Sequence, residues 1–532
     1  MATSLQDLKD LSTVPQARRE PRPPGLVARN VLPSLGNLAL LLVLYLLYVS
    51  KLRFLLDGDT GWHIRAGDWI RQTGSVPRTD IFSFTVANQP WFAWEWLTDV
   101  AMSLLHSRFG LAGVTYATWM VLLTAYALLY HVMRQRNADP GLASVLMVFT
   151  ALASIVHWLA RPHVVSILLL VIWMTLVENH RRYRSRHTMR MIYALPLLIA
   201  LWANLHGAFM VTFVLLGIYA AGEWLELAVA GRWREWQVVV PYATVGLLSA
   251  IAALFTPYGF ALYGHLFRYL GDNQLLSLID EFKSPDFHSL DGKFIEILLL
   301  LGFAAAARAV YQGRFVEAGL VALWSHMTLQ SERHVALAVV VLMPIIAEQG
   351  TAWLRSVGIG WQRLDGVRRW YGEISLIDRQ LNGVLIPLLI IVILSGLITR
   401  PAAAKVFGNS FSAKNFPVEA AEFIEQQLVA NALRGNVYAP DRFGGYLIYR
   451  FAPRVKVFAD GRSDLYRQST VLDDMSRLAK GRSDWAAILA RYDIEWMVLQ
   501  RDEPLSLMAV QSGEWKVAHA DATAQVLIRQ GR

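Results

Sequence analysis

Long apolar runs recur along most of this chain, and they constrain its fold more than any other feature. The first run extends from about residue 31 to 56, and comparable runs follow as far as about residue 400. Because a helix needs roughly 20 apolar residues to cross the hydrocarbon of a bilayer, these runs predict transmembrane helices. Hydrophobic residues make up 55% of the chain, more than is typical of a soluble domain. The sequence therefore predicts an α-helical polytopic membrane protein.

Basic residues between the runs indicate the orientation. The Pro/Arg-rich segment 1–30 precedes the first run and lacks the apolar core of a signal peptide, and the short segment 180–187 is dense in arginine. Short basic loops stay in the cytoplasm. We therefore expect a cytoplasmic N-terminus, and Asp57 on the outside of the inner (plasma) membrane. About eleven spans are expected, near 31–56, 112–133, 141–160, 163–179, 191–207, 208–229, 237–256, 294–312, 315–329, 335–350 and 383–400.

Charge and cysteine content exclude several classes of function. The net charge of +9 comes with basic residues placed between the spans, so it predicts cytoplasmic loops and no nucleic-acid partner. The chain has no cysteine, which excludes disulfides, zinc–thiolate sites and a cysteine nucleophile.

Two external loops within the membrane domain, 31–402, are long enough to carry structure of their own. In the first, 57–110, the segments 60–73 and 91–109 mix tryptophans with charged residues, which is typical of helices that lie along a membrane surface. The second, 257–292, is longer than most connections. It either closes over a substrate or is a solvated connection with an amphipathic helix.

The composition changes after the last span. From 403 to 532 charged residues are frequent and apolar runs shorten. Strands are expected at 436–439, 455–459, 495–499 and 525–528, and helices at 485–492 and 505–511. Such alternation predicts a small soluble α/β domain, and the odd number of spans places it on the same side as Asp57.

Ionisable residues gather at the outer end of the first span. Asp57 and Asp59, followed by His63, lie just beyond it. Because ionisable groups are costly near hydrocarbon, this cluster favours a site for a charged substrate. One carboxylate would be a general base for an acceptor hydroxyl, and the other would hold the geometry or bind a cation. The alternative is a helix end followed by an ordinary Asp-Gly turn.

Later hairpins are expected to bring basic residues to the same face. Arg161 and His163 interrupt one pair of spans, and Arg333 and His334 connect another. Arginine on the outer side opposes the positive-inside bias, which favours a role in binding an anion such as phosphate. An internal ion pair between Glu332 and Arg333 is the alternative.

Four further residues are candidates for contacts with the substrate. Glu95 lies between two tryptophans, whose rings either cover the apolar face of a sugar or anchor the segment at the interface. Asn204 and His206 end another span at the same level, and Glu281 offers a carboxylate from the second external loop.

Short motifs along most of the chain resemble a known superfamily. They are Asp57-Gly58-Asp59, Glu95-Trp96-Leu97, Arg161-Pro162-His163, Asn204-Leu205-His206-Gly207, Pro257-Tyr258-Gly259, Ser284-Pro285-Asp286-Phe287, Phe443-Gly444-Gly445 and Asp460-Gly461-Arg462. The chain resembles the polytopic C-type glycosyltransferases, which include the protein O-mannosyltransferases and the bacterial aminoarabinose lipid A transferases, and within them a broad bacterial branch.

The resemblance implies an inverting transferase that takes a sugar from a polyprenyl-phosphate donor and passes it to a glycan, lipid or protein acceptor. It implies Asp57 or Asp59 as the base, because an acidic residue of the first external loop has that role in the superfamily. Arg161, His163, Arg333 and His334 would steady the departing phosphate. A divalent cation is left open, since two carboxylates and one histidine are too few ligands to predict it. A lipid-linked sugar transporter and a non-catalytic factor for envelope polysaccharide assembly are the alternatives.

Overall fold

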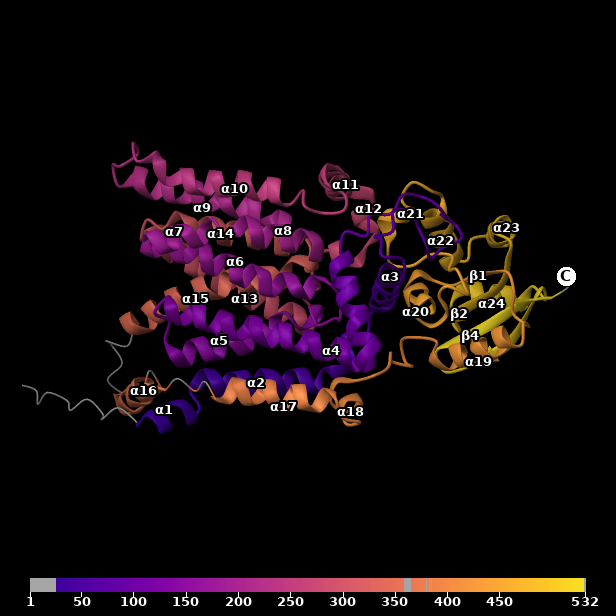
Figure 1. Cartoon of the computed structure of the whole chain (residues 1–532), viewed down its shortest axis with the longest axis horizontal. Helices are drawn as coiled ribbons and strands as arrows, with labels where there is room; N and C mark the ends of the chain where they lie inside the picture. The colour runs from indigo at the N-terminus through magenta and orange to yellow at the C-terminus, as the bar shows by residue number, and fades with distance from the viewer. Residues whose placement is uncertain (1–24, 358–364, 379, 382, 384, 531–532) are drawn as a thin grey trace, which may run out of the picture.

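The computed structural model describes residues 25–357, 365–378, 380–381, 383 and 385–530, so most of the segment 1–30 lies outside the described residues. Figure 1 shows two parts. Long helices run side by side in a bundle, and a smaller part with a β-sheet covers one end of it. Helices α3 and the first part of α4 lie where the two parts meet.

Among the described residues, seven helical segments are long and apolar enough to cross a membrane. The predicted count of about eleven spans is not confirmed. The segments are Val27–Val49, Trp96–Gln135, His163–Tyr183, Arg186–Leu205, Gly207–Val229, Leu290–Tyr311 and Glu332–Ser356, and shorter apolar helices cover Pro140–Ala153, Trp236–Ala252 and Leu385–Ile398.

The helices of the bundle follow the apolar runs of the sequence. They are α1 (Leu26–Val31), α2 (Leu35–Val49), α4 (Trp96–Gln135), α5 (Pro140–Ala153), α6 (His163–Tyr183), α7 (Arg186–Ile192), α8 (Leu195–Leu205), α9 (Val211–Val229), α10 (Val240–Ala252), α13 (Leu290–Tyr311), α14 (Phe315–Gln330), α15 (Val335–Val357), α16 (Asp365–Asp378) and α17 (Leu385–Ile398). Helix α15 is the most buried of the long segments and packs against α4, α5, α6, α13 and α14.

Local signals set the helix ends. The side chain of Asp139 accepts hydrogen bonds from the backbone N–H groups of Gly141 and Leu142, and Pro140 opens α5. The side chain of Ser289 caps α13 by accepting from the N–H of Gly292. A capping side chain satisfies N–H groups that have no partner inside the helix, and proline at the first position costs no hydrogen bond.

The first external loop contains the two expected helices, with one changed boundary. Helix α3 spans Asp59–Thr73, as expected over 60–73. The second helix begins at Trp96, and not at Trp91, because the backbone N–H of Trp91 donates to the carbonyl of Arg78. Gly110, at φ 62°, separates this helix from the rest of α4. Glycine adopts that conformation without steric cost, so the kink lies where the sequence allows it.

The second external loop is folded onto the first. It contains α11 (Phe260–Gly271), α12 (Asn273–Leu278) and a short 3-10 turn, Asp280–Phe282. The hydroxyl of Tyr258 accepts from the backbone N–H of Ala93 at 2.7 Å and donates to the carbonyl of Pro77 at 3.1 Å. This part of the second loop is therefore held by the backbone of the first.

The C-terminal part contains a four-stranded sheet with the strand order β1-β2-β4-β3. Strand β1 runs parallel to β2, and the other neighbours are antiparallel. The strands are β1 (Asn436–Tyr438), β2 (Ile494–Gln500), β3 (Trp515–Ala520) and β4 (Ala524–Arg529), and the helices are α18 (Ala403–Phe407), α19 (Val418–Val429), α20 (Asp441–Phe451), α21 (Ser463–Tyr466), α22 (Val471–Ala479), α23 (Trp485–Arg491) and α24 (Pro504–Gln511). Three expected strands and both expected helices are present, and β3 was not expected.

The prediction of a strand at 455–459 is wrong. The segment joins none of the four strands and makes one isolated bridge, between Val457 and Ser83 of the first external loop. The N–H of Val457 donates to the carbonyl of Phe82 at 3.0 Å, and its own carbonyl accepts from Phe84 at 3.2 Å. The backbone of this segment therefore attaches the C-terminal part to the first loop.

Close glycine contacts bring α20 against α3. A Cβ atom on Gly61 would lie 2.5 Å from the carbonyl oxygen of Gly445, and one on Gly445 would overlap the carbonyl oxygen of Gly58. A Cβ atom on Gly461 would overlap the carboxylate of Asp59. Glycine permits this approach because it has no side chain. The C-terminal part and the Asp57 loop thus lie at the same end of the bundle, as expected.

Candidate functional site

A cavity of about 480 Å³ opens where the first loop, the second loop and the C-terminal part meet. Seven of the eleven residues proposed from the sequence line it: Asp57, Asp59, His63, Glu95, Arg161, Glu281 and Arg333. They come from segments far apart in the chain. Acidic residues of the first loop and arginines of later hairpins thus line one cavity, as the sequence pattern predicts. The roles of these residues are proposals.

Arg161 is the centre of a carboxylate cluster in this cavity. One guanidinium nitrogen, Nη1, lies 2.7 Å from Asp57 Oδ2 and 2.6 Å from Glu281 Oε1. The other, Nη2, lies 3.0 Å from Asp59 Oδ2. Three acids on one cation leave an excess of negative charge. Arg161 holds the acids together, and it is not free for an incoming anion unless one of them gives way.

Arg333 is the less committed cation. Its Nη1 atom lies 3.8 Å from Glu281 Oε2, and its guanidinium lies 4.9 Å from the centre of the Phe282 ring. Glu332 was the alternative ion-pair partner predicted for Arg333, but the ion pair of Arg333 in the structure is with Glu281. Arg333 also makes a side-chain hydrogen bond with Tyr269. Because its 3.8 Å contact with Glu281 is too long for a hydrogen bond, Arg333 keeps donors for a further anion in the cavity.

The carboxyl groups of this cluster differ in their pKa values. Burial, followed by the charge of Asp57, raises the pKa of Asp59 to about 8, although Arg161 acts to lower it. The charge of Arg161 lowers the pKa of Glu281 below its usual range. Burial acts to lower the pKa of Arg161, but the charges of Asp57, Glu281 and Asp59 outweigh it and hold that pKa well above its usual value. Asp59 is thus the acid of this cluster that is tuned toward neutral pH.

Glu95 lies between two imidazoles at the back of the cavity. Its Oε2 atom is 3.6 Å from Nε2 of His63, and its Oε1 atom is 3.4 Å from Nε2 of His206. The other nitrogen of His63, Nδ1, contacts Asp99 Oδ1 at 2.6 Å. Burial raises the pKa of Glu95 to about 7 and lowers the pKa of His63 well below its usual value. Glu95 therefore binds or releases a proton near neutral pH beside a neutral imidazole.

Two of the predicted histidines are turned away from the cavity. His163 and His334 do not line it. Nε2 of His163 lies 3.0 Å from the carbonyl of His157, and Nδ1 of His334 lies 3.0 Å from the carbonyl of Met327. Both rings bind local backbone, so the structure gives no support to direct contact with a phosphate.

Asn204 and His206 also lie outside the lining of the cavity. Asn204 accepts from the indole N–H of Trp96 at 2.8 Å and donates to the carbonyl of Phe255 at 2.9 Å. His206 contacts Glu95 from behind and binds Ser166 Oγ at 2.8 Å. These two residues support the wall of the cavity and do not reach its interior.

The C-terminal part contributes a wall of the cavity that was not predicted from the sequence. Arg462 lines the cavity, is 4% exposed, and makes a paired contact with the carboxylate of Asp460 at 2.7 Å on each oxygen. It also reaches Asp80 at 2.9 Å and lies 4.5 Å from the centre of the Trp91 ring. The motif Asp460-Gly461-Arg462 was noted for its resemblance alone. The available signal was this motif, together with the expectation that the C-terminal domain lies on the same side of the membrane as Asp57.

The described residues contain no group of three or more His, Asp or Glu side chains that could hold a metal ion. Asp57 and Asp59, the pair considered for a cation, both face the guanidinium of Arg161. A divalent cation at these two carboxylates would have to displace Arg161.

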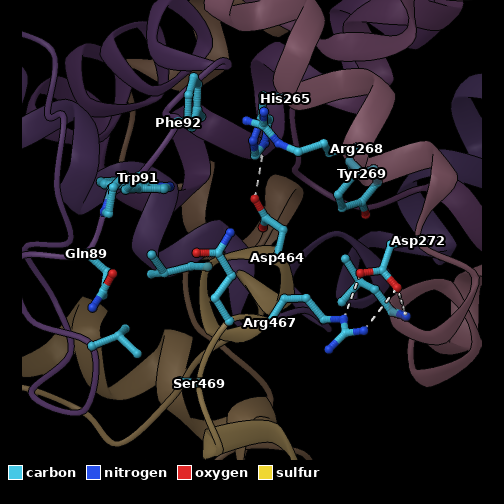
Figure 2. Close-up of a pocket in the computed structure, with 15 residues that line it drawn as sticks. Gln89, Trp91, Phe92, His265, Arg268, Tyr269, Asp272, Asp464, Arg467 and Ser469 are labelled. Atoms are coloured by element: carbon cyan, nitrogen blue, oxygen red, sulfur yellow. Dashed lines mark hydrogen bonds and ion pairs between the residues drawn. The ribbon is translucent and has the colours of Figure 1, made fainter.

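A second cavity, of about 430 Å³, adjoins the first (Figure 2). The two cavities share Trp91, Phe92, Tyr269 and Asp464 as lining residues. In Figure 2, Gln89 and Trp91 lie on one side, and His265, Tyr269 and Asp272 lie on the other. The C-terminal part closes the remaining side.

No family model matches the chain, and no curated protein matches it either. Solved structures with a similar fold are found. The oligosaccharyltransferase of Archaeoglobus fulgidus, tethered to an acceptor peptide with the NVT sequon, has a TM-score of 0.54 at 12% identity, over 87% of this chain and 69% of that chain. AglB, an archaeal oligosaccharyltransferase from the same organism, in complex with an inhibitory peptide and a dolichol-phosphate, has a TM-score of 0.53 at 12% identity, with the same coverage.

ArnT from Cupriavidus metallidurans, bound to undecaprenyl phosphate, has a TM-score of 0.51 at 14% identity. The similarity covers 92% of this chain and 97% of that chain. At such identities these similarities concern the fold alone, since one fold hosts many functions. The chain thus shares its fold with these oligosaccharyltransferase and ArnT structures.

Proposed function

We propose that this protein is a membrane glycosyltransferase that moves a sugar from a polyprenyl-phosphate donor to an acceptor at the outer face of the membrane. The observation that carries the proposal is the single cavity in which Asp59 and Asp57 face Arg161 and Arg333. Dolichol-phosphate and undecaprenyl phosphate are bound by two proteins of this fold, which supports a donor of the same chemical class.

In this proposal Asp59 is the base. It takes the proton of an acceptor hydroxyl while the oxygen forms a bond to C1 of the sugar, and the bond from C1 to the phosphate oxygen breaks with its electron pair on the phosphate. A base works best when its pKa is close to the working pH, and the raised pKa of Asp59, about 8, suits this role. Asp57 accepts from the backbone N–H of Asp59 at 2.9 Å and positions it.

Arg333 stabilises the leaving phosphate in this scheme. Negative charge builds on the phosphate as the sugar leaves, and a fixed cation in a site that excludes water lowers the energy of that state. Attack opposite the leaving phosphate inverts the configuration at C1. Arg161 keeps the acids in place, so the two arginines have different tasks.

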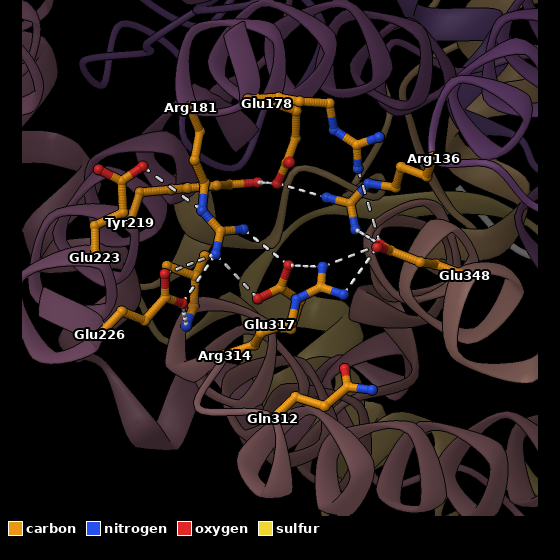
Figure 3. Close-up of polar contacts among 12 residues, drawn as sticks. Arg136, Glu178, Arg181, Tyr219, Glu223, Glu226, Gln312, Arg314, Glu317 and Glu348 are labelled. Carbon is orange, nitrogen blue, oxygen red and sulfur yellow. Dashed lines mark hydrogen bonds and ion pairs between the residues drawn. The ribbon is translucent and has the colours of Figure 1, made fainter. Parts of the chain in front are cut away.

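The distribution of charge favours an enzyme over the alternative of a transporter. At the opposite end of the bundle, arginines and glutamates form a network of ion pairs (Figure 3). Arg181 pairs with Glu317 at 2.8 Å and with Glu226 at 2.9 Å, and Arg136 pairs with Glu178 at 2.6 Å. Between the two ends, residues 338–343 of α15 are apolar and almost wholly buried. A charged permeation route along this part of α15 would need polar groups there.

The test is turnover in a membrane. The full chain is reconstituted in nanodiscs with polyprenyl-phosphate sugars, and release of polyprenyl phosphate is measured. We expect Asp59→Asn to reduce the rate by about 10²–10⁴-fold, the usual contribution of a general base. Asp473→Asn, at a carboxylate whose side chain is 73% exposed, is the matched control and should not change the rate.

If the Asp59→Asn protein releases polyprenyl phosphate at the wild-type rate, Asp59 is excluded as the base. If the wild-type protein releases none from any donor while the glycan in cells still depends on the chain, the non-catalytic assembly role replaces the proposal.

A further inference from the structure

We propose that the second cavity binds the carbohydrate part of the acceptor, an inference that rests on the proposed function. The cavity adjoins the first, and Trp91, Phe92, Tyr269 and Asp464 line both. In this proposal a chain seated in the second cavity has its end beside the carboxylates of the first loop. The acceptor is a hydroxyl-rich glycan in this proposal, and neither a peptide nor an acyl chain.

The walls combine rings with polar groups in the way that a sugar requires. Phe92 and Tyr269, which are half-buried, offer aromatic surface, and the C–H face of a pyranose packs on such rings while its hydroxyls point sideways. Gln89 and Gln468 are exposed at the rim. Amide groups both donate and accept hydrogen bonds, so they match hydroxyls, which do the same. Arg268, also exposed at the rim, adds fixed donors.

Two contacts between side chains shape this cavity in advance. Asp464 lies 3.3 Å from Nε2 of His265, and Arg467 Nε lies 2.7 Å from Asp272 Oδ2 (Figure 2). Each pair joins the C-terminal part to the second external loop. A site that is already formed loses less conformational entropy when a ligand binds.

The same contacts disfavour an acyl chain. A lipid tail in the cavity would take water away from the charged groups of Asp464, Arg467 and Asp272 without offering them hydrogen bonds, and that desolvation is costly. An extended peptide is most often bound by pairing with the edge of a sheet. None of the residues that line the cavity belongs to the sheet of the described C-terminal part. The walls thus favour hydroxyl groups over backbone amides or methylenes.

Binding to the full chain in nanodiscs tests this inference. The probes are maltoheptaose, chitopentaose and an oligogalacturonate, with an unstructured Gly/Ser peptide and a short-chain phosphatidylglycerol for comparison. The rim variant combines Gln89→Ala, Arg268→Ala and Gln468→Ala, three exposed positions outside the catalytic cavity. The matched control combines Gln426→Ala, Arg482→Ala and Gln511→Ala, which are exposed in the C-terminal part.

We expect at least one saccharide to bind the wild-type protein and to bind the rim variant about tenfold or more weakly, as the loss of several hydrogen bonds implies. The control variant should bind as the wild type does. The inference is overturned if no saccharide binds, if the rim variant binds it equally well, or if only the peptide or the lipid loses affinity.

A second readout separates this inference from the proposed function. With donor present, the rim variant should raise the KM for the saccharide acceptor and leave the KM for the donor unchanged. Failure of the wild-type protein to turn over any donor counts against the proposed function alone. Turnover with an unchanged acceptor KM in the rim variant counts against the acceptor cavity alone.

Discussion

At the scale of single residues, the site depends on how one guanidinium is shared by three acids. Arg161 contacts Asp57, Asp59 and Glu281, yet it lowers the pKa of Glu281 while burial raises that of Asp59 to about 8. Neighbouring carboxyls whose pKa values are pushed apart are typical of sites that move protons. The side chain of Asp59 is 12% exposed and that of Glu281 is 35% exposed, which explains much of the contrast.

The first prediction at this scale concerns pH. If ionised Asp59 is the base, kcat/KM rises as pH increases through about 8 and levels off above it, because the acid must lose its proton to act. Glu281→Gln removes a negative charge that raises the pKa of Asp59, so the midpoint should move to lower pH. The pH profile of polyprenyl phosphate release measures both. An unchanged midpoint in Glu281→Gln protein would show that another group titrates.

The second prediction concerns the leaving phosphate. Arg333→Gln should reduce kcat/KM for the donor by about 10²–10³-fold, the usual effect of removing one fixed donor from a developing anion. Arg333→Lys should restore part of the rate, because an ammonium keeps the charge but not the two-pronged geometry. Thermal unfolding serves as the control and should change little. Equal rates for the glutamine variant and the wild type would contradict the assignment.

At the scale of secondary structure elements, the contact between α3 and α20 sets the distance between the two halves of the site. Gly58 and Gly61 meet Gly445, and Gly461 meets the carboxylate of Asp59. Any side chain at these positions would push the C-terminal wall away from the first loop. The helix that begins at Asp59 is therefore positioned from both sides.

This contact gives a prediction for Gly445→Ala. The new methyl group would overlap the carbonyl of Gly58, so α20 must shift, and overpacking of this kind costs about 1–3 kcal/mol. We expect a lower Tm and slower turnover. Gly217→Ala is the matched control, because a Cβ atom there meets nothing within 4 Å and alanine favours a helix. If the two variants have the same Tm and the same turnover, the close contact between α3 and α20 does not affect function.

At the scale of the whole molecule, the two ends of the bundle have different tasks. One end carries the cavities between the external loops and the C-terminal part, and the other carries the ion-pair network of Figure 3. Glu317, which is fully buried, pairs with both Arg181 and Arg314 and so ties α6 to α14. This network fastens helix ends far from the proposed chemistry.

The separation of the two ends predicts that stability can be changed without changing the site. Glu317→Gln leaves Arg181 and Arg314 short of negative charge, and breaking a buried ion pair costs about 3–5 kcal/mol. We expect a clearly lower Tm and an unchanged pH midpoint of turnover. Glu235→Gln, in a pair whose side chains are 58% and 51% exposed, should leave the Tm almost unchanged, because exposed ion pairs contribute little to stability. A shifted pH midpoint in Glu317→Gln protein would show that the two ends are coupled.

The helical bundle and its main segments could be predicted from the amino-acid sequence, because apolar runs and capping residues act on their own neighbours in the chain. The sequence also indicated Asp57, Asp59, Arg161 and Arg333, since ionisable groups at the ends of apolar runs stand out without any structure. The strand expected at 455–459 failed for the opposite reason: its apolar pattern suited a sheet, but its backbone pairs with Phe82 and Phe84.

The way the site is built could be seen only in the folded chain. Folding brought Arg462 and Gly461 against the first loop, turned His163 and His334 toward local backbone, and committed Arg161 to three acids. These contacts join segments that lie far apart in the chain. The pKa of Asp59 depends on the same packing, because burial and nearby charges, and not residue type, set how strongly a carboxyl holds its proton.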